Sequence, residues 1–322
     1  MSSDSDSIQF SVGSTCHSKP LSHWAVGWFA VLLALATTVE AQTQASCVFK
    51  IFQLDTDTSN TSSSLGGVND FGTVVGSRFF LHGNIQGLIR YSGGGITYFN
   101  APNGTNTNFT DRNDSGISTG YYFNQNSGRE EGFLLNGSRF TSISRSGSPT
   151  FVYGINKWNT AVGAYAFGAY PSFHGFKRYN NGGFAAINYP GALGTSPAGI
   201  NDSGTVVGSY FLSSQQDPFY SQHGFIYHNG QWATLDYPDS TVWTELNGIS
   251  NAGVIIGNTI SNTGGIQTIQ TAFIYENGVF KIISVPNEPL TQVTGISARL
   301  GLISGVALDF SGATEGFTAT CK

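Results

Sequence analysis

The sequence predicts an all-β fold, a six-bladed β-propeller with four antiparallel strands in each blade. The composition is the first observation: 42 of the 322 residues are Gly and 24 are Phe, whereas charged residues make up only 10%. Such a composition favours turn-rich β structure over amphipathic helices. The second observation is a motif that recurs six times along the chain. The third is that each copy contains four short runs rich in Val, Ile, Phe and Tyr, separated by Gly, Asn and Asp, as expected of strands joined by hairpins.

Residues 1–41 are predicted to form an N-terminal extension that ends in a signal peptide. A short apolar run within HWAVGWFAVLLALATTVEAQ (23–42) precedes Val39-Glu40-Ala41. Small residues at these positions suit signal peptidase, so cleavage is expected after Ala41. The run is short for a membrane span, although an uncleaved anchor is the alternative because few positive charges precede it. Residues 42–322 are then predicted to be a single exported propeller domain, secreted or periplasmic.

The repeated motif opens each copy with two strands around a tight turn. Its six copies are GVNDFGTVVG (67–76), DRNDSGISTG (111–120), GINKWNTAVG (154–163), GINDSGTVVG (199–208), GISNAGVIIG (248–257) and GISARLGLISG (295–305). Successive copies begin 44, 43, 45, 49 and 47 residues apart. This period is typical of a propeller blade, a small twisted sheet that buries its faces only by stacking on neighbouring blades.

Each copy then continues with a third and a fourth strand. The third strands are QGLIRY (86–91), EGFLLN (131–136), HGFKRY (174–179), HGFIYH (223–228), TAFIYE (271–276) and EGFTAT (315–320). The fourth strands are GITYFNAP (95–102), SRFTSIS (138–144), GFAAINYP (183–190), QWATLDYP (231–238) and VFKIISVP (279–286). The sixth copy reaches the end of the chain after its third strand, so its fourth strand has to come from elsewhere.

The period, the GINDSGTVVG opening and the HGF and TAF tripeptides resemble the extracellular HAF repeat family, named for a His-Ala-Phe tripeptide. The resemblance covers nearly all of the chain after residue 41. This sequence departs from the pattern because Gly mostly replaces Ala, and His remains only at His174 and His223. The resemblance implies a secreted, propeller-like protein from a bacterial source, and it implies no assigned activity.

The segment CVFKIFQLD (47–55) resembles GVFKIISVP (278–286), which contains the fourth strand of the fifth copy. Both contain Val-Phe-Lys-Ile at matching positions. We therefore predict that this N-terminal segment supplies the missing fourth strand of the sixth blade and closes the ring.

The same alignment predicts how the cysteines pair. Cys321 takes the position of Asn277, and Cys47 takes that of Gly278, which are the two turn residues of the equivalent hairpin. The third cysteine, Cys16, lies in the extension that is expected to be removed. In an exported protein the remaining two cysteines predict one disulfide, which replaces the hairpin turn where the chain is interrupted.

The repeated NDSG sequence has two interpretations. Asn and Asp form local hydrogen bonds, and the closing Gly supplies positive φ, which predicts a plain tight turn. The alternative is a calcium loop, but Asp70, Asp114 and Asp202 each offer one carboxylate without the alternating acidic series of such a loop. The plain turn is preferred, and no metal or cofactor is expected. The third and sixth copies lack NDxG, which leaves their turn geometry open.

The residue before Gly-Phe in the third strand is polar but chemically inconsistent. The six residues are Gln86, Glu131, His174, His223, Thr271 and Glu315. A metal site built from the two histidines is one interpretation. Their position on equivalent strands of adjacent blades, away from the central channel, favours ordinary polar strand positions instead.

The loops predict where binding occurs. Turns between strands one and two and between three and four are short and lie on one face, whereas the other links are long and lie on the opposite face. Long loops on a rigid scaffold commonly carry binding residues, and these contain aromatics among small polar residues, which suits sugar stacking or peptide binding. The candidate ligand-binding residues are Tyr165, Tyr170, Tyr189, Phe219, Tyr220, Tyr237 and Trp243. The alternative for aromatics such as Tyr189 and Tyr237, in Tyr-Pro pairs, is packing between blades.

These observations favour a secreted, monomeric, non-catalytic propeller that binds an extracellular carbohydrate or protein partner through its long-loop face. The sequence contains no GxSxG, HExxH or P-loop motif, and nothing in it orders Ser, His and Asp into a triad. One alternative is a polysaccharide hydrolase or lyase that uses carboxylates among Asp217, Asp239, Glu245 and Glu288. Another is a structural envelope or matrix component. A net charge of −5 argues against nucleic acid as a partner.

Overall fold

The structure is a computed structural model. It describes residues 43–54, 61–80, 83–145, 147–167, 172–212, 221–239, 242–263, 266–308 and 314–322. The predicted extension and signal peptide lie outside the described residues. The chain from Gln42 to Lys322 forms one compact unit, and this unit is described below.

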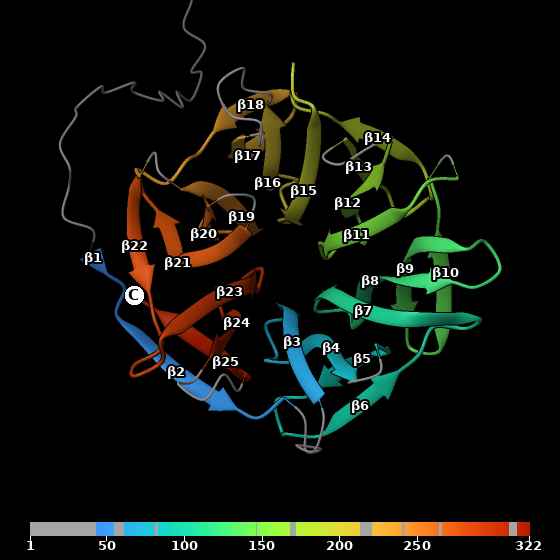
Figure 1. Ribbon diagram of the computed structural model, residues 1–322, viewed down its shortest axis with the longest axis horizontal. Coiled ribbons are helices and arrows are strands. Elements are labelled where there is room, and N and C mark those ends of the chain that lie inside the picture. The colour runs from blue at the N-terminus through green and yellow to red at the C-terminus, as the bar shows by residue number, and fades with distance from the viewer. Residues whose placement is uncertain are drawn as a thin grey trace, which may run out of the picture. The chain divides into compact units, whose positions relative to one another are not determined.

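The described strands form six antiparallel blades arranged in a ring, which confirms the predicted fold (Figure 1). Blade one contains β3 (Thr61–Val68), β4 (Val74–Phe80), β5 (Ile85–Arg90) and β6 (Ile96–Phe99). Blade two contains β7 (Gly104–Arg112), β8 (Ile117–Asn124), β9 (Arg129–Asn136) and β10 (Arg139–Ile143). Blade three contains β11 (Thr150–Ile155), β12 (Ala161–Ala166), β13 (Phe173–Arg178) and β14 (Phe184–Ile187). Blade four contains β15 (Gly194–Ile200), β16 (Val206–Leu212), β17 (Ser221–His228) and β18 (Gln231–Thr234).

The last two blades share the N-terminal strands of the unit. Blade five contains β19 (Trp243–Ile249), β20 (Ile255–Thr263), β21 (Ile266–Glu276) and β22 (Val279–Ile283), with β1 (Thr43–Gln44) added at its edge. Blade six contains β23 (Leu290–Ile296), β24 (Ile303–Leu308), β25 (Thr314–Cys321) and β2 (Cys47–Phe52). The first strand of each blade faces the centre of the ring, and the fourth lies at the rim (Figure 1).

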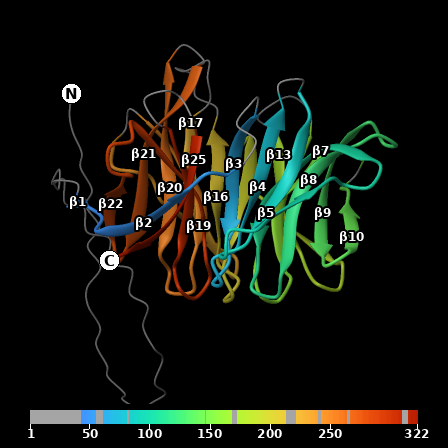
Figure 2. The same ribbon diagram turned by 90° about the horizontal axis from the view of Figure 1, so that it is seen from below.

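The predicted ring closure is confirmed. Strand β2 pairs antiparallel with β25, crossing the outside of blade six (Figure 2), and Cys47 lies directly opposite Cys321. These two cysteines form a disulfide with an S–S distance of 2.04 Å. The structure adds one contact that the sequence did not predict: β1 pairs in parallel with β22, so the N-terminal segment joins blade five to blade six.

The tripeptide of the third strand forms the core of each blade. Its Phe is fully buried in five blades, as Phe133, Phe176, Phe225, Phe273 and Phe317, and Leu88 occupies the position in blade one. The residue before it packs closely against its own blade and the next one. A Cβ added to Gly224 would lie 2.3 Å from the carbonyl oxygen of Leu235 in the same blade and 2.8 Å from the side chain of Leu246 in the next. Five blades have Gly at this position, whereas blade five accommodates the buried Ala272.

The NDxG turns have the geometry that the sequence predicted, and the structure settles the two atypical copies that the sequence left open. Gly72, Gly116 and Gly204 close the NDxG turns with φ values of 71°, 80° and 85°. In the third copy Asn159 adopts φ 59° in place of Gly, and in the sixth Gly301 adopts φ 63°. Asn tolerates this left-handed region better than other side chains do, so the third turn keeps its shape without glycine.

Candidate functional site

The NDxG turns of neighbouring blades are joined to one another by side-chain hydrogen bonds around one end of the channel. In each of four turns the first Asn accepts hydrogen bonds within its own turn; for example, Asn201 Oδ1 accepts from the backbone of Thr205 at 3.0 Å. Its Nδ2 then donates to the turn of the next blade. The four bonds, each from an Asn Nδ2 to a backbone carbonyl oxygen at 3.0–3.4 Å, run from Asn69 to Asn113, from Asn113 to Asn156, from Asn156 to Asn201 and from Asn201 to Ser250. The repeated Asn therefore links blades as well as shaping turns.

The ring of turns closes between blades six and one through Asp70. Its carboxylate accepts from the backbone N–H groups of Arg299 and Leu300 at 3.1 and 2.9 Å, and it pairs with the Arg299 guanidinium at 2.9 Å. Burial alone would raise the pKa of Asp70, but these hydrogen bonds outweigh burial and hold the pKa well below its usual range. This carboxylate has a structural role, because its acceptor sites face the neighbouring turn.

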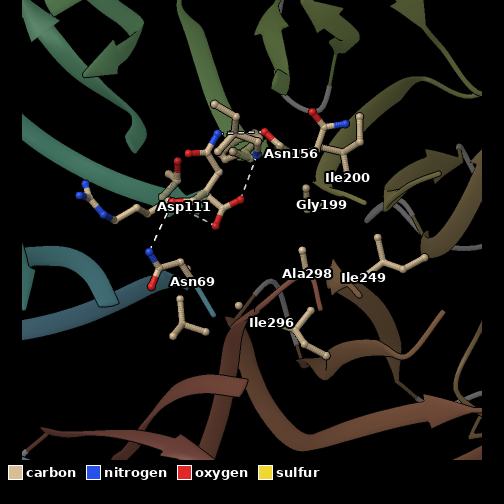
Figure 3. A pocket seen from close by; sticks show the side chains of 18 of the residues that line it. Asn69, Asp111, Asn156, Gly199, Ile200, Ile249, Ile296 and Ala298 are labelled. Atoms are coloured by element: carbon tan, nitrogen blue, oxygen red, sulfur yellow. Dashed lines mark hydrogen bonds between the residues drawn. The ribbon is translucent and has the colours of Figure 1, made fainter. Parts of the chain in front are cut away.

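The channel inside this ring is narrow and is lined by the inner strands (Figure 3). Five inner strands carry Gly at equivalent positions, namely Gly67, Gly154, Gly199, Gly248 and Gly295, and blade two carries Asp111 instead. The missing side chains allow the strands to approach closely: a Cβ on Gly67 would lie 2.1 Å from Asp111 Oδ1. The Asp111 carboxylate fills the space that Gly67 leaves.

Asp111 is bonded by backbone groups of two blades. Its Oδ1 accepts from Arg112 N at 2.8 Å, and its Oδ2 accepts from Ile155 N at 2.9 Å. Burial raises the pKa of Asp111 to about 6, although both hydrogen bonds act in the opposite direction. Sequence reasoning did not single out Asp111; the signal was the departure of this one copy from the repeated Gly.

The carboxylates proposed for a glycosidase lie on separate elements. Glu245 lines the channel from β19, and burial raises its pKa. Asp239 lies in the link after β18, and Glu288 in the link after β22, whereas Asp217 falls outside the described residues. Within the described part of the chain, no three His, Cys, Asp or Glu side chains gather in a way that would hold a metal ion.

A groove of about 590 Å³ lies where the end of β4 and the start of β5 in blade one meet the start of β7 in blade two. We call it the blade-one groove. Its lining consists of Arg78, Phe80, Asn84, Ile85, Gln86, Asn100, Gly104, Thr105 and Asn106. Its volume lies in the range usual for small-molecule sites, and its side chains include four amides, one guanidinium and one aromatic ring.

Arg78 is held rigidly at the wall of this groove. Its guanidinium carbon lies 3.7 Å from the centre of the Tyr98 ring and 4.7 Å from that of Phe80. Gln86 Oε1 accepts from Nε and Nη2 of Arg78 at 2.9 and 2.6 Å. Asn106 Oδ1 accepts from Ile85 N at 3.2 Å, which connects the groove wall of blade two to that of blade one. The site is therefore ordered before a ligand enters.

The predicted aromatic ligand residues do not form one patch in the described residues. Tyr170, Phe219 and Tyr220 lie outside the described residues. Tyr165 lies in β12 beside His174, and Trp243 begins β19. Tyr189 stacks at 3.7 Å on Tyr210 of the next blade, so it packs at the seam between blades three and four. Tyr237 is only 6% exposed and lies 5.3 Å from both Phe273 and Phe280 in the core.

The two histidines occupy equivalent positions on adjacent blades, each beside a tyrosine. His174 packs against Tyr165, and His223 stacks on Tyr210. The structure differs from the sequence interpretation in one respect: it brings Ser221, His223 and Asp236 into direct contact. Sequence reasoning missed this set because Asp236 comes two residues after the fourth strand, and only the hairpin brings it beside the third strand.

With the ring and its sites described, the chain is a six-bladed β-propeller of four-stranded blades. No family model matches the sequence, and no curated protein matches it. Solved structures share the architecture. The β-propeller domain of the Trilobed protease from Pyrococcus furiosus is 9% identical over 81% of this chain and 93% of that chain, with a TM-score of 0.46.

Two further solved structures give similar values. A mutant of Aleuria aurantia lectin in complex with Fucalpha1-6GlcNAc is 11% identical over 80% of this chain and 91% of that chain, with a TM-score of 0.49. A mutant of AofleA from Arthrobotrys oligospora is 12% identical over 89% of this chain and 86% of that chain, with a TM-score of 0.47. At such identities and scores, these likenesses carry no information about a ligand. In the part of the chain that the structure describes, no helix is long and apolar enough to cross a membrane.

Proposed function

We propose that this protein is an exported, glycan-binding propeller and that the blade-one groove is its ligand site. The single observation that supports this is the groove itself, with its volume of about 590 Å³ and its wall of Arg78, Asn84, Asn100 and Asn106. Side-chain amides offer both donors and acceptors to sugar hydroxyls. A guanidinium adds donors in a fixed plane, which suits a hydroxyl pair or a sugar carboxylate.

The chemistry of the groove supports binding rather than turnover. The described residues of its lining include no Asp, Glu, His, Ser or Cys side chain, whereas glycoside hydrolysis uses a pair of carboxylates. Phe80, which is partly exposed, supplies an apolar surface for the C–H face of a sugar ring. The proposal therefore assigns ligand binding to only part of the long-loop face that the sequence analysis considered, namely the part on blades one and two.

The proposal includes membership of the HAF repeat family and export. Six repeat copies and the HGF and TAF tripeptides support the family, and the Cys47–Cys321 disulfide is consistent with an oxidising compartment. Peptide mapping of protein recovered outside the cell tests export, with Gln42 expected as the first residue. An intact N-terminus in that material would contradict signal cleavage.

A glycan array followed by isothermal titration calorimetry tests the binding site. Arg78→Ala is expected to weaken binding of the best glycan at least tenfold, and Arg78→Lys should recover little because it lacks the planar fork. Arg145→Ala is the matched control, because Arg145 also lies over an aromatic ring, Phe184 at 4.4 Å, but outside the groove. Equal affinity of the Arg78 variants and the parent protein would refute the assignment, provided that their thermal unfolding midpoints agree.

A further inference from the structure

Three side chains at the outer part of blade four form a connected chain of hydrogen bonds. Ser221 and His223 belong to β17, where alternate residues face the same side of the sheet. His223 Nε2 lies 3.1 Å from Ser221 Oγ, and His223 Nδ1 lies 2.7 Å from Asp236 Oδ2. Asp236 comes two residues after the end of β18. The hairpin between β17 and β18 therefore brings all three together.

The identity of the partners determines where the protons lie. An ionised carboxylate can only accept, so the hydrogen between Asp236 and His223 sits on Nδ1. When the ring is neutral, its lone pair is then on Nε2, which faces the hydroxyl of Ser221, and the serine O–H is the group that can donate to this nitrogen. A general base that activates a serine nucleophile needs this tautomer and this order of groups.

The imidazole of His223 is held in place by Asp236 and Tyr210. Asp236 Oδ1 accepts from the backbone N–H of Gly224 at 3.0 Å, which orients the carboxylate. The imidazole lies against the Tyr210 ring, with centroids 5.2 Å apart and ring planes at 24°. Tyr210 is 4% exposed, and its hydroxyl contacts Thr234 Oγ1 at 2.9 Å. The side chains of His223 and Asp236 keep exposed fractions of 29% and 37%, so the set is rigid but accessible.

The other blades provide a comparison within the same chain. In blade three the equivalent residues are Ser172, His174 and Asn188, so an amide replaces the carboxylate. Asn188 Oδ1 still accepts from the backbone of Gly175 at 3.0 Å, which reproduces the Gly224 contact. Blade three therefore has the same scaffold without the group that fixes the tautomer of the base, and it serves as a natural control.

We propose that Ser221, His223 and Asp236 form a serine hydrolase site that acts on short acyl esters. Ser221 Oγ bonds to the ester carbonyl carbon while its proton passes to His223 Nε2. The tetrahedral adduct breaks its bond to the alcohol oxygen, which takes the proton from Nε2 and leaves. Water then attacks the acyl-serine, gives its proton to Nε2, and releases the carboxylic acid as Ser221 regains its hydrogen. Asp236 is a positioning residue that orients the imidazole and stabilises its cation.

This activity is independent of the proposed glycan binding, because it lies on blade four and not in the blade-one groove. The first test is a fluorophosphonate probe, which bonds to activated serines, followed by mass mapping of the modified peptide. Modification of Ser221 is expected in the full chain, and modification of Ser172 is not. A folded protein with Ser221 unmodified would overturn the proposal.

The second test measures hydrolysis of p-nitrophenyl acetate with purified variants. Ser221→Ala and His223→Ala are each expected to lower the rate by about a hundredfold or more, the size of a general-base contribution. Asp236→Asn should lower the rate by at least about tenfold and change the pH profile, since the base loses its fixed tautomer. Ser172→Ala is the matched control and should leave the rate unchanged. Equal loss in the Ser172 and Ser221 variants, or no loss in either, would contradict the assignment.

Discussion

Removal of the Cys47–Cys321 disulfide is the perturbation whose effect follows most directly from the structure. The bridge joins β2 to β25 where every other blade has a continuous hairpin or link. In a Cys47→Ser, Cys321→Ser variant the six residue pairs between these strands remain available, so the folded blade is expected to stay closed. The effect should therefore arise mainly in the unfolded chain.

The length of the closed loop gives the magnitude. The two cysteines are 274 residues apart. The chain-entropy relation for a loop of that length gives roughly 19 cal/mol/K, or about 5.6 kcal/mol at 25 °C. Natural bridges commonly contribute about 2 to 5 kcal/mol. We expect the double variant to lose about 3 to 5 kcal/mol of unfolding free energy, near the upper end because the loop spans nearly the whole domain.

Urea unfolding followed by tryptophan fluorescence measures this loss. The parent protein, its reduced form and the double variant are compared. The reduced protein and the double variant should agree, and both should show a larger dependence on urea, since an uncrosslinked chain exposes more surface. A loss below about 1 kcal/mol would refute the entropy argument, and it would mean that strand pairing alone closes the ring.

The remaining predictions concern the channel, the ring of turns and the glycine of the third strand. The pKa of Asp111 is raised to about 6 by burial. The protonated carboxyl therefore stabilises the fold fully below pH 4, and this stabilisation is lost as pH rises through 6. Asp111→Asn should remove this dependence, about 3 kcal/mol between pH 4 and pH 8, and parallel stability profiles for variant and parent would contradict it. Asn201→Ala deletes bonds within its turn and the bond to Ser250 O; it should cost about 2 to 4 kcal/mol by denaturant titration, and a cost below 1 kcal/mol would mean that the links between turns are dispensable. Gly224→Ala places a Cβ 2.3 Å from Leu235 O and should cost about 2 kcal/mol or more, with a neutral thermal midpoint as the contrary result.

Much of the fold could be predicted because the residues that specify each blade lie close together within one copy of the repeat. Alternating apolar residues define strands, and the Gly and Asn of the turns define hairpins, so each blade is specified within one copy. The comparison of CVFKIFQLD with VFKIISVP even predicted the closure, since a strand of the same pattern fits the same edge. The turn of the third copy was predictable only in part, because its Asn159 performs the role that Gly performs elsewhere.

The sites were less accessible to sequence reasoning, because they depend on contacts between copies. Tyr237 and Tyr189 share a Tyr-Pro sequence, yet one is buried in the core and the other stacks at a seam between blades. The sequence analysis searched the long loops for aromatic residues, whereas the walls of the blade-one groove come from strands of two blades. The contact of Ser221, His223 and Asp236 likewise requires the register of a hairpin, which a search for local motifs does not reveal.

By itself, the sequence determined the class of fold, the number of blades, the strand that completes the last blade and the pairing of the two cysteines. These features follow from periodic hydrophobicity and turn chemistry, which act over a few residues. Only the tertiary structure decided that each repeated Asn also bonds to the next blade, that Asp111 occupies the space left by Gly67, and which polar side chains meet. The physical reason is that these contacts join residues 43 or more positions apart, or on opposite strands of a hairpin, whose distances are set by blade packing and strand register.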